Sequence, residues 1–120
     1  MANKKNETYK NLDKKIKSTS IQKYFDMLNS PYPDFKCKAI KELTKRKIKI
    51  PTIKNFLQDP NEDVRVTAYT YLEKMGILDT QTIKESLKDK SPKIRQKAIA
   101  SYITMGITPI EYILKFAKDP

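Results

Sequence analysis

Residues 57–76 read LQDPNEDVRVTAYTYLEKMG and residues 87–106 read LKDKSPKIRQKAIASYITMG, so the second stretch repeats the first thirty positions later. Within each copy, apolar residues recur at spacings of three and four, which is the period of one face of an α-helix. In the first copy this apolar stripe consists of Val64, Ala68, Leu72 and Met75. An internal repeat of this length indicates an architecture built from tandem structural units.

A weaker copy of the same pattern lies 29 residues upstream of the first. Phe35 aligns there with Val64, and Lys36 aligns with Arg65. Lys47 stands where the two stronger copies have a glycine. The sequence therefore contains two strong copies and one degenerate copy of a single unit.

Proline and glycine mark the ends of the helices in each copy. Pro60, Pro92 and Pro109 fit the first helical turn, where the missing N–H has no partner within the helix. Gly76 and Gly106 fit the residue after a helix, where the backbone becomes left-handed. No segment alternates apolar and polar residues as a strand does. The sequence predicts an all-α protein with helices near 20–29, 33–46, 51–58, 61–75, 80–89, 92–105 and 109–118.

The motif Leu-x-Asp-Pro-x-x-x-Val-Arg-x-x-Ala over residues 28–120 resembles a HEAT repeat. It is similar to the short form, of roughly thirty residues, that occurs in phycobilin lyase-type and in archaeal and bacterial HEAT-like proteins. The resemblance implies a right-handed α-solenoid of about seven helices in stacked antiparallel pairs. It implies that the first helices of the pairs form the convex face and the second helices the concave face. It also implies polar ladders between repeats, formed by Asp59, Arg65, Asp89 and Arg95.

Charge divides the chain unevenly. The formal net charge is +11, and residues 1–60 carry fifteen Lys and Arg against six Asp and Glu, whereas residues 61–120 carry ten against eight. We expect a basic flexible tail at 1–19, followed by a single HEAT-like domain at 20–120. Such a basic pole attracts polyanions, nucleic acid among them. The candidate nucleic-acid contacts in the tail are Lys4, Lys5, Lys14, Lys15 and Lys17.

Several classes of function lack the residues that they need. The chain has no histidine, one cysteine and two glycines. These counts exclude a His-dependent catalytic triad, an intrachain disulfide and a glycine-rich phosphate loop. The sequence thus predicts a non-enzymatic protein without a cofactor or metal site. With no apolar run long enough to span a bilayer, we expect a cytoplasmic protein that does not enter a membrane.

What remains is the surface, and the helices at 51–58, 80–89 and 109–118 are predicted to form its concave side. Their apolar stripes turn inward, which leaves a lysine row toward a partner: Lys54, Lys84, Lys88, Lys115 and Lys118. Tyr112 lies on the last of these helices, which is apolar nearly all round. We therefore predict a scaffold that binds a protein, an acidic one fitting the row, through this face or the C-terminal end. Self-association through the C-terminal helix is a further hypothesis.

Two alternatives remain open for these surfaces. The lysine row and the basic N-terminal half could instead hold nucleic acid without sequence specificity, or the row could be an ordinary solvated face. Single-stranded nucleic acid would also need exposed rings on which bases can stack. Tyr32, Tyr69 and Tyr112 are the candidates for such rings, with a core position as the alternative for each.

Overall fold

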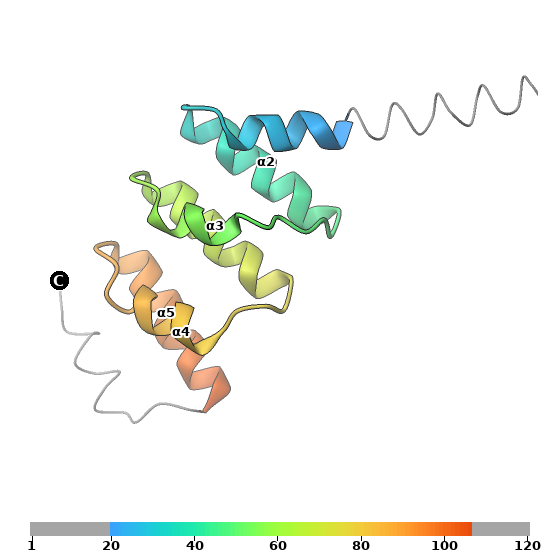
Figure 1. Ribbon diagram of the computed structural model, residues 1–120. Helices are drawn as coiled ribbons and strands as arrows, with labels where there is room; N and C mark the ends of the chain where they lie inside the picture. The colour runs from blue at the N-terminus through green and yellow to red at the C-terminus, as the bar shows by residue number, and fades with distance from the viewer. Residues whose placement is uncertain (1–19, 107–120) are drawn as a thin grey trace, which may run out of the picture. The chain divides into compact units, whose positions relative to one another are not determined.

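A computed structural model describes residues 20–106, and within this range the chain is helical and contains no strand (Figure 1). The predicted all-α fold is confirmed. The predicted helix at 109–118 and the tail at 1–19 lie outside the described residues. The helices are a segment at 20–28, α2 (Pro33–Lys45), the 3-10 helix η1 (Ile53–Gln58), α3 (Glu62–Lys74), α4 (Thr80–Ser86) and α5 (Pro92–Met105).

The chain divides into two compact units, with the boundary between Ile50 and Pro51. Unit 1 (Met1–Ile50) contains the helical segment 20–28 and α2, and unit 2 (Pro51–Pro120) contains η1, α3, α4 and α5. The degenerate copy of the repeat thus begins in unit 1, whereas both strong copies of the motif lie in unit 2.

In unit 1, α2 begins and ends as its sequence dictates. Pro33 occupies the first turn, where its fixed φ suits a helix. The helix buries Ala39 and Leu43 on one side. After its last turn, Lys47 has a φ of 58°, in the left-handed region, and its N–H donates to the Thr44 carbonyl oxygen. Lys47, which replaces the glycine of the other copies, therefore still adopts the left-handed backbone conformation of those glycines.

Replacing Lys47 with glycine is expected to raise the free energy of unfolding by about 1 kcal/mol, because a side chain in the left-handed region crowds the following carbonyl. Gly76, at the equivalent position after α3, has a φ of 70°. Urea denaturation followed by circular dichroism measures the gain. The reverse change, Gly76→Ala, should cost a similar amount, and a stabilising Gly76→Ala would contradict the explanation.

In unit 2, each short helix packs against the long helix that follows it. The η1 helix packs on α3, α4 packs on α5, and α3 also lies against α5 (Figure 1). The repeat pattern predicted the short helices as second in their pairs. This prediction is wrong, because each short helix comes first in its pair. Because the two long helices contact each other between pairs, they form the layer that joins the two repeats.

Both short helices also differ from their predicted form. Residues 53–58 form a 3-10 helix, and α4 ends at Ser86 although a helix was predicted to residue 89. The amides of Lys88 and Asp89 donate to carbonyl oxygens three residues back, which tightens the last turn of α4. Asp59 precedes a proline and is extended, at φ −62° and ψ 140°, so η1 ends there.

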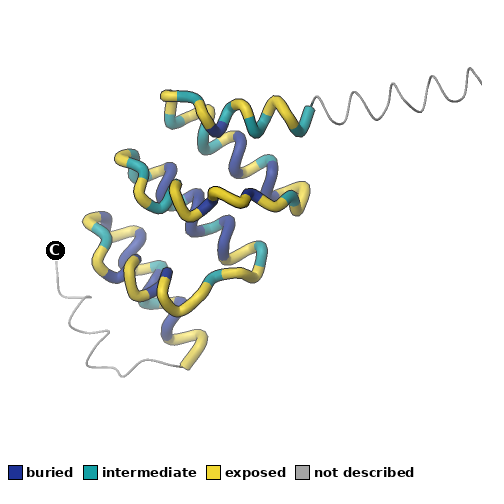
Figure 2. The backbone as a smooth tube through the Cα atoms, in the orientation of Figure 1, coloured by how far each residue is buried: buried dark blue, intermediate teal, exposed yellow. Residues whose placement is uncertain are grey.

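The core of unit 2 repeats with the sequence. The buried stretches recur along α3 and α5 (Figure 2). Ala68 and Ala98 are fully buried at equivalent positions, as their place in the motif predicts. Around Ala98, the side chains of Ile83, Leu87 and Tyr102 form one apolar cluster between α4 and α5. This packing holds α4 against α5 and leaves the remaining helix faces exposed.

Candidate interaction surfaces

A buried ion pair joins the two repeats of unit 2. The Arg65 guanidinium donates from Nε and Nη2 to the two carboxylate oxygens of Asp89, over 3.1 and 3.2 Å. Its Nη1 donates to the carbonyl oxygens of Asp59 and Pro60, at 2.9 and 3.1 Å. The two side chains are only 5% and 13% exposed. Arg65 therefore ties the turn before α3 to the turn before α5.

The rest of the implied ladder follows the same plan. Arg95 donates from Nη1 to the carbonyl oxygen of Asp89 at 2.8 Å, as Arg65 does to that of Asp59. The carboxylate of Asp59 accepts from the backbone N–H of Asn61, and that of Asp89 accepts from the backbone N–H of Ser91. The charged groups of these four residues hydrogen-bond to one another or to the backbone, so their role is structural.

Among the predicted contact residues, Lys54 already has a partner. Its Nζ donates to the Asp79 carboxylate at 2.6 Å. Asp79 is also the N-cap of α4, where it accepts from the Thr82 amide at 2.7 Å. The hydrogen bond from Lys54, with those from Thr82, lowers the pKa of Asp79 to about 2. Lys54 thus links η1 to the start of α4, which reduces its availability for a partner.

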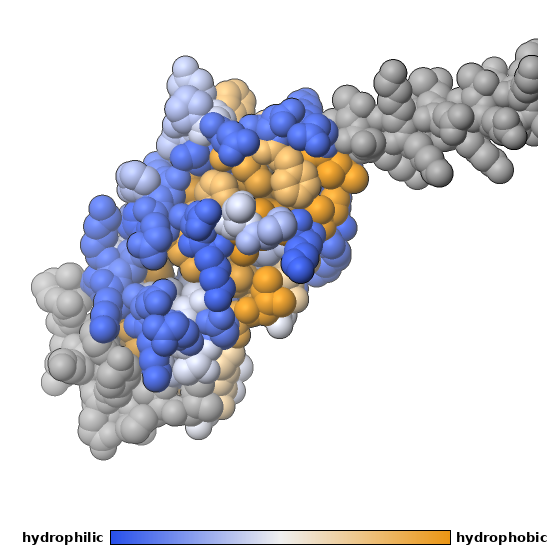
Figure 3. All heavy atoms as spheres, in the orientation of Figure 1, coloured by the Kyte–Doolittle hydropathy of each residue, from blue (hydrophilic) through white to orange (hydrophobic). Residues whose placement is uncertain are grey.

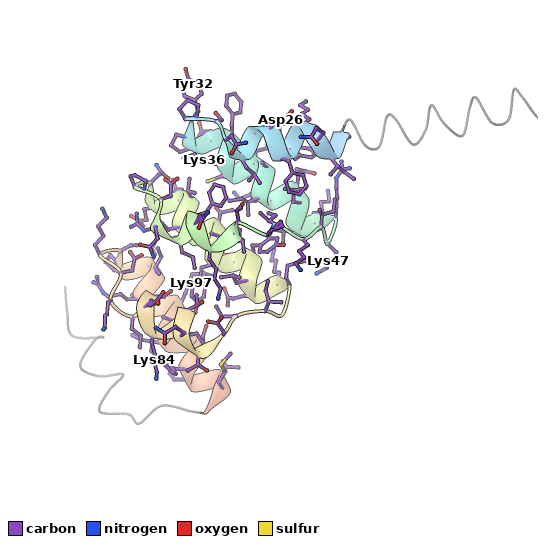
Figure 4. All side chains as sticks on the ribbon, viewed as in Figure 1. Asp26, Tyr32, Lys36, Lys47, Lys84 and Lys97 are labelled. Atoms are coloured by element: carbon purple, nitrogen blue, oxygen red, sulfur yellow. The ribbon has the colours of Figure 1, made fainter. Side chains whose placement is uncertain are left out.

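Two other predicted residues, Lys84 and Lys88, are exposed on the outer side of α4 and of the turn that follows. Lys84 extends away from the helix (Figure 4), and the visible surface over α4 is mainly hydrophilic (Figure 3). Neither lysine pairs with a carboxylate in the part of the chain that the structure describes. The other predicted contacts, Tyr112, Lys115, Lys118, Lys4, Lys5, Lys14, Lys15 and Lys17, lie outside residues 20–106.

Tyr69 occupies the core and cannot act as a stacking platform. It is fully buried, and its hydroxyl lies 2.7 Å from the Ser101 hydroxyl in a hydrogen bond between α3 and α5. Burial raises the pKa of Tyr69 to about 12. Tyr32, in contrast, is 63% exposed. Of the two candidate rings in the described range, only Tyr32 is therefore accessible.

Unit 2 exposes apolar side chains that the sequence analysis missed. Ile103 is 65% exposed and Met105 is 42% exposed, both at the C-terminal end of α5. Thirty residues before Ile103 stands Glu73, an exposed residue that pairs with Lys97 over 3.1 Å. Comparing the copies identifies Ile103, because an aliphatic residue stands there at a position where the preceding copy has an exposed glutamate.

Neither a metal-binding cluster nor a membrane-crossing helix is found in the described part of the chain. No group of three or more Cys, Asp or Glu side chains there is arranged to hold a metal ion. No helix within residues 20–106 has the length and apolar character that crossing a bilayer requires.

Tandem helical pairs joined by a buried Arg–Asp clamp define a helical-repeat protein of the α-solenoid class. The family model for HEAT repeats matches residues 21–103, so the chain belongs to the HEAT repeat family. Neither the curated proteins nor the solved structures compared with this chain give a significant match. HEAT repeats are generally non-enzymatic scaffolds for protein interaction.

Proposed function

We propose that this chain is a non-enzymatic scaffold that binds another protein through the apolar end of α5. The observation that carries the proposal is the exposure of Ile103 at a register where the preceding copy has Glu73. A single exposed aliphatic residue is common on a protein surface. Here Met105 lies two residues further on and is also exposed, so a second apolar side chain stands at the same end of α5.

Two exposed lysines, on α4 and on the turn that follows it, add positive charge to the surface of unit 2. Lys84 and Lys88 are four residues apart, and Lys84 lies in the last turn of α4. Lys88 lies beyond the end of α4, in the turn that leads to α5. An apolar contact on a unit that also carries exposed lysines fits an acidic protein partner. Tyr112, Lys115 and Lys118 remain further candidate contacts from the sequence. Lysines at the border of an interface act mainly on the association rate and its salt dependence.

The test is affinity capture with the full chain as bait, followed by binding measurements with the purified partner. Ile103→Glu introduces the residue found at the equivalent position of the preceding copy, so we expect it to fold. It should weaken binding by at least about tenfold, because one desolvated side chain at an interface centre contributes that much. Thr104→Glu, an exposed neighbouring change, is the matched control and should bind as the unaltered chain does.

Equal partner binding by the two variants would refute the apolar site. Lys84→Glu together with Lys88→Glu should weaken binding mainly at low salt, and no effect would leave these lysines as a solvated face. Sedimentation of the chain alone tests the hypothesis of self-association. A dimer that Ile103→Glu dissociates would make a second copy the partner in place of a different protein.

A further inference from the structure

A pair of exposed rings begins α2 in unit 1, at positions where the other copies of the repeat have structural residues. Tyr32 is the N-cap residue of α2 and makes no side-chain capping hydrogen bond. The residue at this position in the next copy is Asn61, whose side chain accepts from the Val64 amide at 3.2 Å. Tyrosine is a poor capping residue, so helix formation does not explain its presence.

Phe35 departs from the repeat in the opposite way. Its equivalents, Val64 and Ile94, are 0% and 1% exposed, whereas Phe35 is 49% exposed. Its ring packs on that of Tyr32 edge to face, with centroids 5.8 Å apart and planes at 79°. Tyr32 projects from the start of the helix (Figure 4). Two large rings therefore support each other at the surface, where core packing uses little of their area.

A row of lysines follows the rings along α2. Lys38, Lys41 and Lys45 recur at spacings of three and four, opposite the buried Ala39 and Leu43. All three are exposed, and within residues 20–106 none has a hydrogen-bonding or ionic partner. The row spans about 10 Å of helix at 1.5 Å per residue.

Two carboxylates lie near this row. Asp34 lies in the first turn of α2, where negative charge is favourable at a helix N-terminus. Glu42 pairs with Arg46 at 4.0 Å, and Arg46 also lies over the Tyr24 ring, 5.3 Å from its centroid. The positive charge of the lysine row thus remains largely uncompensated.

We propose that this face of unit 1 binds single-stranded nucleic acid, with bases stacking on Tyr32 and Phe35 and phosphates contacting Lys38, Lys41 and Lys45. Proteins that bind single strands combine cationic side chains that follow the backbone with aromatic rings that stack on bases. A duplex hides the faces of its bases, so the rings favour a single strand. The lysines are point charges without a bidentate fork, so we expect little sequence specificity. This proposal concerns a different unit from the protein-binding site and does not depend on it.

The experiment is fluorescence anisotropy of the full chain with a labelled oligodeoxythymidine of about 20 nucleotides, from about 50 to about 200 mM salt. The double variant Tyr32→Asn with Phe35→Val inserts the residues found in the next copy, so we expect it to fold. It should raise the dissociation constant by about tenfold or more, since each stacked base contributes substantially to binding. Its salt dependence should match that of the unaltered chain.

A second variant tests the lysine row. Replacing Lys38, Lys41 and Lys45 together with alanine should reduce the slope of log K against log salt by about 2, because each single-strand phosphate contact contributes about 0.7. The matched control replaces three exposed lysines of unit 2, Lys74, Lys90 and Lys93, and should leave affinity nearly unchanged. Circular dichroism verifies helix content in every variant.

Three outcomes would overturn the proposal. The first is the absence of binding at about 50 mM salt, where phosphate contacts are strongest. The second is equal or tighter binding to a duplex of the same length, which would remove the role of the rings. The third is an equal loss from the unit 2 lysine control, which would show a general effect of net charge rather than a site on α2.

Discussion

Replacing Arg65 with methionine is expected to lower the free energy of unfolding by about 3–5 kcal/mol, because it removes one partner of a buried ion pair. Methionine fills much of the space of the side chain but donates no hydrogen bond. Asp89 would retain a carboxylate whose side chain is only 13% exposed, and the carbonyl oxygens of Asp59 and Pro60 would lose a donor. Urea denaturation followed by circular dichroism measures the change.

The control is a second ion pair between the same two repeats. Lys93 of α5 and Glu62 of α3 lie 3.9 Å apart, with side chains 71% and 43% exposed. Solvent screens such a pair, so Lys93→Gln should cost less than about 1 kcal/mol. If Arg65→Met costs no more than Lys93→Gln, the buried pair does not hold the repeats together.

The repeat pattern predicts the long helices well. The predicted ranges 33–46, 61–75 and 92–105 differ from α2, α3 and α5 by at most one residue at either end. The local signals are a proline in the first turn of α2 and of α5, the Asn61 cap of α3 and a left-handed residue after each helix. Pro60, which was predicted in the first turn of α3, lies before that cap. Each helix between these signals is amphipathic. Local chemistry therefore determines these helices. The short helices are less exactly predicted, because six or seven residues carry little periodicity.

The pairing of the helices could not be obtained from the period alone. A repeat of thirty residues can be divided before the long helix or before the short one, and both divisions give the same periodicity. The contact of α4 with α5 resolves this choice. The chemistry of the surface is equally non-local, since the partner of Lys54 is Asp79, 25 residues away.

The candidate sites of unit 1 and unit 2 have a common signal in the sequence. In each case a residue breaks the rule that its equivalents follow: Tyr32 at a capping position, Phe35 at a core position and Ile103 at a solvent-facing position. A functional residue that also fits the repeat pattern cannot be distinguished from a structural residue by the pattern alone. Residues that violate it at the surface are better candidates for function, because packing does not require them.

The two proposed sites should differ in how strongly salt weakens their binding. Phosphate contacts release counterions, so binding of a single strand to unit 1 falls steeply as salt rises. An apolar contact at Ile103 of unit 2 does not depend on counterions and should persist at the salt concentration that abolishes the first. A titration of both ligands over the same range therefore separates the two activities in one protein.

Replacing Leu87 with alanine is expected to lower the free energy of unfolding by about 2–5 kcal/mol, the range for emptying a well-packed core position. Leu87 is fully buried between α4 and α5, where it packs with Ile83, Ala98 and Tyr102. The cost includes both the lost burial of the side chain and the cavity that remains. Since Ala98 and Tyr102 belong to α5, which follows the turn held by Arg65, we expect little collapse around the cavity.

The equivalent change thirty residues earlier, Leu57→Ala, provides the control, since Leu57 lies at the end of η1 and is only half-buried. It should cost clearly less, because less apolar area leaves water on folding and solvent reaches the space that remains. The same urea denaturation gives both values. If both variants lose the same free energy of unfolding, the two leucines contribute equally to stability. That result would contradict the smaller contribution expected of Leu57 from its half-buried position.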